Sequence, residues 1–360
     1  MSSPPGGLGL ACVVFLVAAF TSGVLVGRVR AFAVKRSIFD IPNSRSSHAR
    51  PTPRGGGAAI AVVLLAGTIL LAAFGLLNHR VAVAIVGGGF SVAVVGWRDD
   101  RRGVPAALRA VVHLAGAIWA VVWLGGFPIA RFGTTQITFG KFGYVLAVVG
   151  IVWSINLFNF MDGIDGIAGV EALSVGAVLA GMLASVNAEG LSMVALLPAG
   201  AAAGFLIWNW PPAKIFMGDV GSGLLGFVFA GLTVASENAR AAPALIVPML
   251  LGVFVFDATI TLIRRATRAE RVYVAHRAHA YQRAVQSGMS HAVVSTGVLA
   301  VNIVLAVLAW TVLQSPQFML MSVLTELLIL STIYCWIEWR RPMKASPIEI
   351  VEATSSGEWQ

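Results

Sequence analysis

Long apolar segments constrain this chain more than any other feature. Eleven of them approach the length of about 20 residues that crosses ~30 Å of hydrocarbon as a helix, which also satisfies every backbone N–H and C=O group internally. Hydrophobic residues make up 58% of the 360 residues and charged residues only 11%, so an ordinary soluble domain is excluded. The predicted fold is an all-α, polytopic membrane protein of about 11 transmembrane helices. These lie at 8–27, 57–77, 81–97, 105–124, 143–160, 167–186, 190–208, 221–235, 243–263, 291–313 and 317–339.

The basic residues predict how these helices are oriented. Of the 25 Lys and Arg residues, 21 fall on one side of the predicted bundle, and the other side holds only Arg80, Arg131, Lys141 and Arg240. The positive-inside rule then places the N-terminus outside and the C-terminus and the long basic loops in the cytoplasm. On the outer side, the alternation in "GGFPIARFGTTQITFGK" predicts a small hairpin. We expect one transmembrane domain over residues 1–345 and a disordered cytoplasmic tail over 346–360.

The net charge of +9 follows from this topology and from attraction to anionic lipids or substrates. It gives no reason to expect nucleic acid as a partner. The lipid bilayer is the expected surrounding of the whole chain.

A polar segment at the end of the fifth predicted helix indicates a functional site. In "NLFNFMDGIDGIAG", polar residues recur every three positions, so they are predicted to form one stripe at a helix end. They are Asn156, Asn159, Asp162 and Asp165. Carboxylates at membrane depth are costly and mark functional sites by default. The alternative is a hydrated turn, since Asp-Gly pairs are common in turns, but a plain turn needs no asparagines one and two turns earlier.

Two further acidic motifs are predicted on the same cytoplasmic side. Asp99 and Asp100 in "GWRDDRRG" repel each other unless a cation lies nearby, which favours Mg²⁺, an ion that binds oxygen ligands and substrate phosphates. The alternative is a charged helix cap. Asp219 in "FMGDVGSG" is flanked by glycines that let a ligand approach the backbone, and it precedes a helix whose free N–H groups favour an anion. No Gly-Lys-Ser/Thr follows, so the segment is not a P-loop.

Together with "RPTPRGGG", these motifs resemble, in this order, the polyprenyl-phosphate N-acetylhexosamine-1-phosphate transferases. This bacterial membrane family includes phospho-N-acetylmuramoyl-pentapeptide transferase and the initiators of O-antigen and teichoic acid synthesis. The similarity covers nearly the whole chain, and the Asn-x-x-Asn-x-x-Asp-Gly-x-Asp-Gly run is its most specific part.

The resemblance implies an enzyme of the bacterial inner membrane with its active site on the cytoplasmic face. Such an enzyme transfers sugar-1-phosphate from a UDP-N-acetylhexosamine to undecaprenyl phosphate and releases UMP, with Mg²⁺, or Mn²⁺ in its place, as cofactor. The product is a diphosphate-linked lipid that starts a cell-surface polysaccharide. Relatives are often homodimers, although no helix face in this sequence requires it.

The resemblance also implies roles for single residues. Asp219 matches a Mg²⁺ ligand, and Asp99 and Asp100 match the acidic pair beside the lipid phosphate, which Asp99 would deprotonate or position. Asn156, Asn159, Asp162 and Asp165 match the nucleotide and diphosphate end of the site, with Asp162 a catalytic candidate. Phe216 matches a residue that stacks on uracil, the alternative being packing at a helix end. His48 and Arg54 are candidate phosphate contacts, or part of a basic loop that meets anionic lipid.

The last large cytoplasmic loop, "HRAHAYQR", departs from the family's His-x-His-His motif. His276, His279 and Arg283 are candidate phosphate or sugar contacts, and the two histidines lack the further ligands that zinc would need. Tyr281 and Gln282 replace histidines, and the variant resembles the branch that uses 6-deoxy-N-acetylhexosamines, so the loop is predicted to select the sugar.

Two further expectations concern the membrane interior. Asp257, inside the ninth predicted helix, is a secondary site residue whose expected partner is an arginine. The alternative function is a secondary transporter, which would also carry carboxylates in an apolar bundle. Transporters hold their ligands near the bilayer midplane, often between repeated halves, whereas the acidic motifs here follow helix ends and no repeat is visible.

Overall fold

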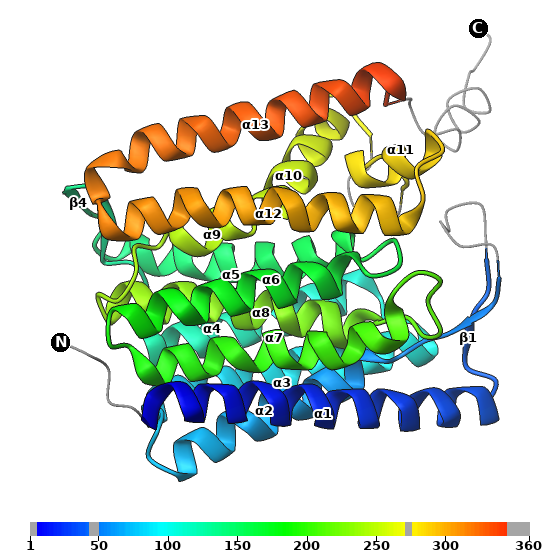
Figure 1. The fold of residues 1–360 in the computed structure, drawn as a ribbon, viewed down its shortest axis with the longest axis horizontal. Coiled ribbons are helices and arrows are strands. Elements are labelled where there is room, and N and C mark those ends of the chain that lie inside the picture. Colours follow the sequence, from blue (N-terminus) through cyan, green and yellow to red (C-terminus); the bar gives the residue numbers. More distant parts are fainter. Residues whose placement is uncertain (1–5, 43–49, 271–275, 344–360) are drawn as a thin grey trace, which may run out of the picture.

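Long apolar helices make up most of the structure, a computed structural model that describes residues 6–42, 50–270 and 276–343 (Figure 1). Within these residues, nine helices are long and apolar enough to cross a membrane. The polytopic helical membrane architecture is therefore confirmed, while the total of eleven spans stays a prediction. The nine are α1 Gly6–Lys35, α3 His79–Arg102, α4 Ala106–Leu124, α5 Phe142–Met161, α6 Ile167–Ser185, α7 Glu189–Asn209, α8 Asp219–Asn238, α12 His291–Gln314 and α13 Met319–Arg340. Helix α2 (Gly57–Ala73) is apolar but shorter.

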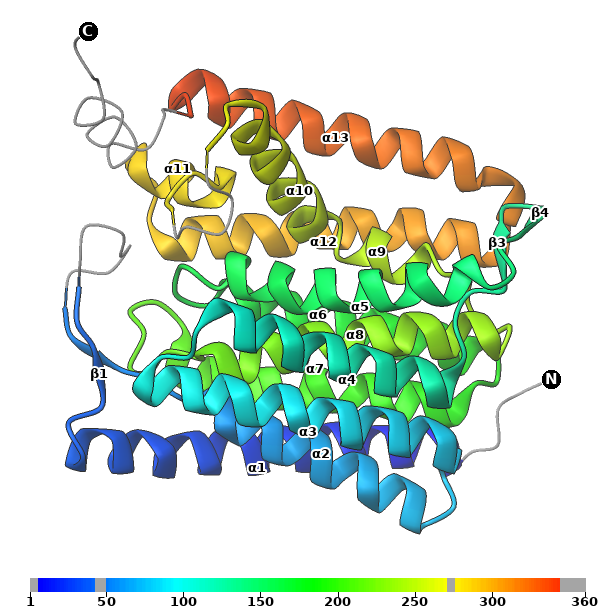
Figure 2. The same cartoon turned by 180° about the vertical axis from the view of Figure 1, so that it is seen from behind.

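The ninth predicted span is two helices rather than one. Helix α9 (Ile246–Leu250) and helix α10 (Gly252–Thr267) are separated at Leu251, and Figure 2 shows α10 inclined to the other helices. Gly252 begins α10, and a Cβ on it would lie 2.2 Å from Glu326 Oε1 on α13. The absence of a side chain at Gly252 therefore lets Glu326 of α13 approach the chain closely.

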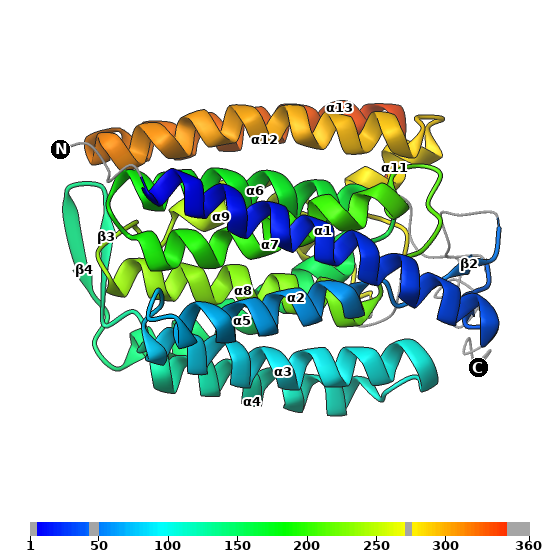
Figure 3. The same cartoon turned by 60° about the horizontal axis from the view of Figure 1, so that its bottom comes forward.

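The helices are stacked so that the most buried of the nine, α8, lies inside the molecule. Figure 3 shows α12 and α13 in one outer layer and α3 and α4 in the opposite one, with α8 between them. In α8, 83% of the most apolar 18-residue window is buried. Helix α2 approaches α8 very closely because Gly57 faces Gly221, where a Cβ on Gly57 would lie 2.4 Å from the Gly221 Cα. The start of α8 is thereby brought against the segment that precedes α2.

The two ends of the bundle carry different short elements. At one end, beside the start of α1, strands β3 (Ile129–Phe132) and β4 (Thr135–Thr138) pair antiparallel and confirm the predicted hairpin (Figure 1). The opposite end holds β1 (Phe39–Asp40), β2 (Thr52–Pro53) and α11 (Ala280–Gln286). Helix α1 starts at the hairpin end and α13 finishes at the other. Which end faces the cytoplasm stays a prediction, and residues 346–360 lie outside the described residues.

Candidate active site

The carboxylate of Asp100 begins the site by capping helix α8. Its Oδ1 accepts the N–H of Asp219 at 2.9 Å and its Oδ2 accepts the N–H of Val220 at 3.2 Å, so it satisfies two of the free donors at the helix start. Gly218 precedes the helix with φ +76°, and a Cβ there would lie 2.4 Å from Asp100 Oδ2. The anion that these N–H groups favour is therefore a side chain of the protein itself. The glycines serve close packing within the protein.

Two arginines join the three aspartates into one acidic–arginine cluster, formed by Arg54, Asp99, Asp100, Arg109 and Asp219. Arg54 donates from Nε to Asp100 Oδ1 and from Nη2 to Asp219 Oδ1, each at 2.9 Å. Arg109 Nη1 lies 2.5 Å from Asp99 Oδ2 and 3.2 Å from Asp219 Oδ2. The side chain of Asp100 is 5% exposed, against 12% for Asp99 and 20% for Asp219. Asp99 and Asp219 are therefore more accessible from solvent than Asp100, whose carboxylate is engaged within the protein.

The position of Arg54 is set by its backbone. Residues 53–57 run beside residues 216–217: Phe216 N–H donates to the Pro53 carbonyl at 2.8 Å, and Gly56 N–H donates to the Phe216 carbonyl at 2.9 Å. Arg54 and Phe216 are thus neighbours at the start of α8, and Phe216 is half-buried. His48, the other predicted phosphate contact of this segment, lies outside the described residues.

The predicted polar stripe is only partly helical. Helix α5 ends at Met161, so Asn156 and Asn159 lie on the helix, while Asp162 is its C-cap and Asp165 follows in the turn. Asn159 Oδ1 accepts the hydroxyl of Ser222 on α8 at 2.6 Å, whereas Asn156 Nδ2 donates to Val152 O in its own helix. The single stripe expected from the spacing is corrected, because the turn at Asp162 breaks the helical repeat.

Asp162 lies in the field of the acidic–arginine cluster. Burial and the charges of Asp219, Asp100 and Asp165 raise the pKa of Asp162 well above its ordinary value, and Arg54 opposes this shift. Four carboxylates thus face two guanidinium groups at this end of the bundle. An excess of buried negative charge is most simply relieved by a cation or a proton.

Asp165 has a different position from Asp162. Its Oδ2 accepts the N–H of Ala213 at 3.0 Å and lies 3.3 Å from His291 Nδ1 at the start of α12, while its carbonyl accepts the hydroxyl of Ser295. Next to it, Gly166 N–H donates to Asn209 Oδ1. Asp165 therefore holds the α5–α6 turn against the segment before α8 and against α12.

A second group of predicted residues surrounds the short helix α11. Asp257 on α10 accepts the N–H groups of Ala280 at 2.8 Å and Tyr281 at 3.0 Å, and its Oδ1 lies 3.5 Å from His279 Nδ1. The predicted arginine partner is wrong, because the carboxylate caps α11 and bonds Thr261 instead.

The side chains of α11 are engaged inside the protein. Tyr281 is 4% exposed and its hydroxyl donates to Phe160 O at 3.0 Å, next to the Asp162 turn. Gln282 is 7% exposed and accepts the N–H of His279. Burial, together with the charges of His279 and Arg265, lowers the pKa of His276 to about 3, so that its ring is neutral. Sugar selection by Tyr281 and Gln282 would therefore be indirect, through the position of the Asp162 turn.

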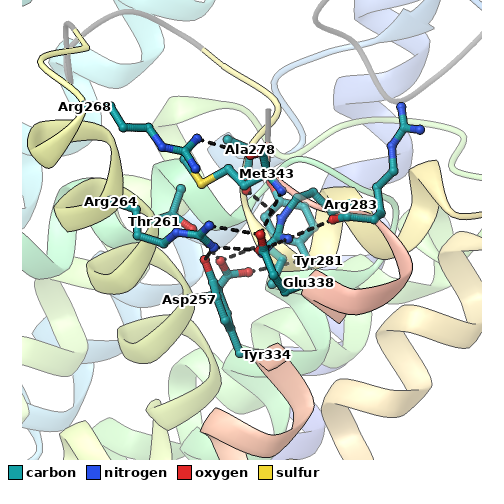
Figure 4. Close-up of polar contacts among 12 residues, drawn as sticks. Asp257, Thr261, Arg264, Arg268, Ala278, Tyr281, Arg283, Tyr334, Glu338 and Met343 are labelled. Carbon is teal, nitrogen blue, oxygen red and sulfur yellow. Dashed lines mark hydrogen bonds and ion pairs between the residues drawn. The ribbon is translucent and has the colours of Figure 1, made fainter. Parts of the chain in front are cut away.

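Arg283 belongs to an ion-pair network that attaches α13 (Figure 4). Its Nη1 donates to Glu338 Oε2 at 2.5 Å, and the same carboxylate accepts both Nη groups of Arg264 on α10 at 2.6 and 2.9 Å. The Arg283 side chain is 2% exposed. Its position joins α11 to α13 and not to the acidic–arginine cluster.

The donor set is chemically suited to Mg²⁺. Among the described residues, no three His, Cys, Asp or Glu side chains are arranged to hold a metal by themselves. Mg²⁺ is usually bound through one or two carboxylates together with waters and substrate phosphates, so such a triad is not required. The partly exposed Asp219 and the nearby Asp162 supply carboxylates in a region of excess negative charge, which fits such an ion.

Several residues of this region were missed by reading the sequence. Arg109 was counted only as a topological charge, Ser222 as part of a glycine-rich segment, and Glu338 not at all. The one signal available for Arg109 was its place one turn into the helix after the Asp99–Asp100 pair.

Comparison with known proteins gives matches over the same helices. Residues 81–237, which span α3 to α8, match the family described as glycosyl transferase family 4. A probable undecaprenyl-phosphate N-acetylglucosaminyl 1-phosphate transferase of Bacillus subtilis is 31% identical over 287 residues, 78% of each chain. A decaprenyl-phosphate N-acetylglucosaminephosphotransferase of Mycolicibacterium smegmatis is 31% identical over 314 residues, 78% of this chain and 76% of the relative. A phospho-N-acetylmuramoyl-pentapeptide-transferase of Corynebacterium jeikeium is 29% identical over 70% of this chain and 81% of its own.

Proposed function

This chain belongs to glycosyl transferase family 4, and from that membership we propose that it transfers N-acetylhexosamine 1-phosphate from a UDP-sugar to undecaprenyl phosphate, releasing UMP. The reaction would take place at the cytoplasmic face of the bacterial inner membrane. The observation that carries the proposal is the acidic–arginine cluster, because it places two partly exposed arginines and two partly exposed aspartates at one end of a membrane bundle. A lipid-borne phosphate and a soluble nucleotide can meet there.

The chemistry needs neutralisation of charge more than covalent help, because both reacting groups are phosphates. Arg54 and Arg109 now bind carboxylates, and in the reaction they would turn to phosphate oxygens, to which guanidinium groups bind well. Asp99 would orient the attacking oxygen of the lipid phosphate. Mg²⁺ or Mn²⁺, held by Asp219 with Asp162 nearby, would supply the remaining positive charge at the diphosphate.

The nucleotide end is assigned to the residues next to this cluster. Phe216 lies beside Arg54 through the paired backbone segments, so a uracil stacked on its ring would bring the diphosphate toward Arg54. Asn159, bonded to Ser222, fixes α5 against the first turn of α8. We propose that the UDP part is shared by all donors and that Asn159→Ala slows them by similar factors.

The proposal is tested by measuring UMP release from purified protein with UDP-N-acetylhexosamines, with and without undecaprenyl phosphate. We expect release only when both substrates and a divalent ion are present. A panel that includes 6-deoxy and 6-hydroxy donors tests the further proposal that this chain starts O-antigen-type polysaccharides on a 6-deoxy sugar. Transport of a solute without UMP release would instead support the transporter, which neither the fold nor the relatives favour.

A further inference from the structure

A groove lies between the ends of α1 and α3, next to the acidic–arginine cluster, with which it shares Arg54 and Asp100. It encloses a cavity of about 270 Å³, with walls formed by Arg28 and Phe32 on α1 and by Trp97 and Arg101 on α3. Arg54 closes its inner end. We call this the α1–α3 groove.

The positive charge of the groove is not neutralised by the protein. Asp100 is the one carboxylate in its lining, and it is already bound by Arg54 and by the first N–H groups of α8. Arg28 and Arg101 form no ion pair with any carboxylate in the described part of the chain. The Arg101 guanidinium lies 4.2 Å from the ring centroid of Trp97 and 5.6 Å from that of Phe32, so aromatic rings hold it across the groove.

The length of helix α1 indicates that the groove lies near the depth of the lipid headgroups. Helix α1 has 30 residues and is therefore about 45 Å long, whereas the hydrocarbon core is about 30 Å thick. Arg28 follows about 33 Å of helix, close to the boundary of that core. Trp97, which lines the same groove and is 45% exposed, is a residue type typical of membrane interfaces.

We propose that the α1–α3 groove binds the phosphate headgroup of an anionic membrane phospholipid between Arg28 and Arg101, with its acyl chains along the exposed faces of α1 and α3. Complementary charge selects the headgroup, and the aromatic rings and apolar walls accept the glycerol and the first part of the chains. The two arginines that would bind the headgroup, Arg28 and Arg101, have no role in the proposed transferase reaction.

The test is a titration of the full-length protein in detergent with phosphatidylglycerol or phosphatidylcholine, read by native mass spectrometry. We expect one phosphatidylglycerol to be retained in preference to phosphatidylcholine. One basic residue near an anionic lipid contributes about a fivefold preference, so Arg28→Ala with Arg101→Ala should weaken the preference by about 30-fold. The matched control, Arg98→Ala with Arg340→Ala, removes the same charge from exposed positions outside the lining and should keep the preference.

Three results would overturn the proposal. One is an unchanged preference in the Arg28/Arg101 variant, and another is an equal loss in the control, which would mean that only net charge matters. The third is displacement of the lipid by equimolar glycerol 3-phosphate, since a soluble phosphate would then be the ligand. If the double variant does not fold, Arg28→Gln alone, at an exposed position, should still lower the preference about fivefold.

Discussion

The starts of α8 and α11 use the same device in different surroundings. At α8, Asp100 accepts the N–H groups of Asp219 and Val220. At α11, Asp257 accepts those of Ala280 and Tyr281. In both places, a buried carboxylate from a neighbouring helix fixes where a helix begins.

The two capping carboxylates differ in the solvent exposure of the groups around them. Beside Asp100 lie further charged groups that reach solvent, with 20% of the Asp219 side chain and 36% of the Arg109 side chain exposed. Beside Asp257, His279 and Tyr281 are almost fully buried and bond within the protein. The comparison teaches that the cap at α8 supports a site open to ligands, while the cap at α11 positions the turn next to that site.

Asp219→Asn tests the solvent-accessible site beside the α8 cap. Of the substitutions considered, it should have the largest effect, a loss of activity. We expect kcat to fall by about 10²- to 10³-fold, the loss that follows removal of a preorganised electrostatic group. Thermal stability should hold, because removing one of four clustered carboxylates relieves repulsion. UMP release at saturating Mg²⁺ and a melting curve measure both quantities. Near-normal turnover in this variant would remove Asp219 from the chemistry.

Asp257→Ala tests the buried cap of helix α11. It leaves the buried N–H groups of Ala280 and Tyr281 without an acceptor, so we expect the free energy of unfolding to fall by about 3 kcal/mol. Asp257→Asn keeps one acceptor oxygen and should recover part of that loss. A variant that melts normally but fails to bind substrate would contradict the division between the two caps.

Arg283→Met sharpens the comparison, because the sequence suggested a ligand contact and the structure shows an ion pair with Glu338. We expect a loss of about 1–3 kcal/mol in stability and little change in KM for the UDP-sugar. Glu338→Gln should be non-additive with it in a double-mutant cycle, because both changes remove the same contact. An increase in KM with unchanged melting would restore Arg283 as a substrate contact.

Asp162→Asn should change the thermal stability less than the other substitutions change theirs or the activity. The size of this change should depend on pH. The folded-state pKa of Asp162 is raised, chiefly by burial, so its neutral form stabilises the fold below the ordinary aspartate pKa of about 4. That stability is lost as pH rises toward the raised pKa. The variant should therefore melt like the wild type near pH 4 and at a higher temperature at neutral pH. Melting curves across this range, without divalent ions, check the sign.

The sequence by itself determined the class of protein and its family. Apolar runs of membrane length specify helices because the bilayer leaves no other way to satisfy the backbone, and the hairpin at 129–138 followed from local alternation. The motifs around Asp99, Asp162 and Asp219 indicated the family through their resemblance to its members, and the cost of carboxylates in so apolar a chain marked them as a candidate site. These are local properties, which neighbouring residues in the chain decide.

Only the tertiary structure decided which of these groups meet and what each one does. Asp99 and Asp100 are adjacent in sequence, yet one reaches Arg109 and the other caps α8, because successive side chains on α3 point in different directions. Arg54 reaches Asp219 across 165 positions only because glycines let α2 touch α8. Arg283 and Asp257 turned inward because α10, broken from α9, brings α11 against α13. Such contacts depend on how helices pack, and no pattern along the chain records that.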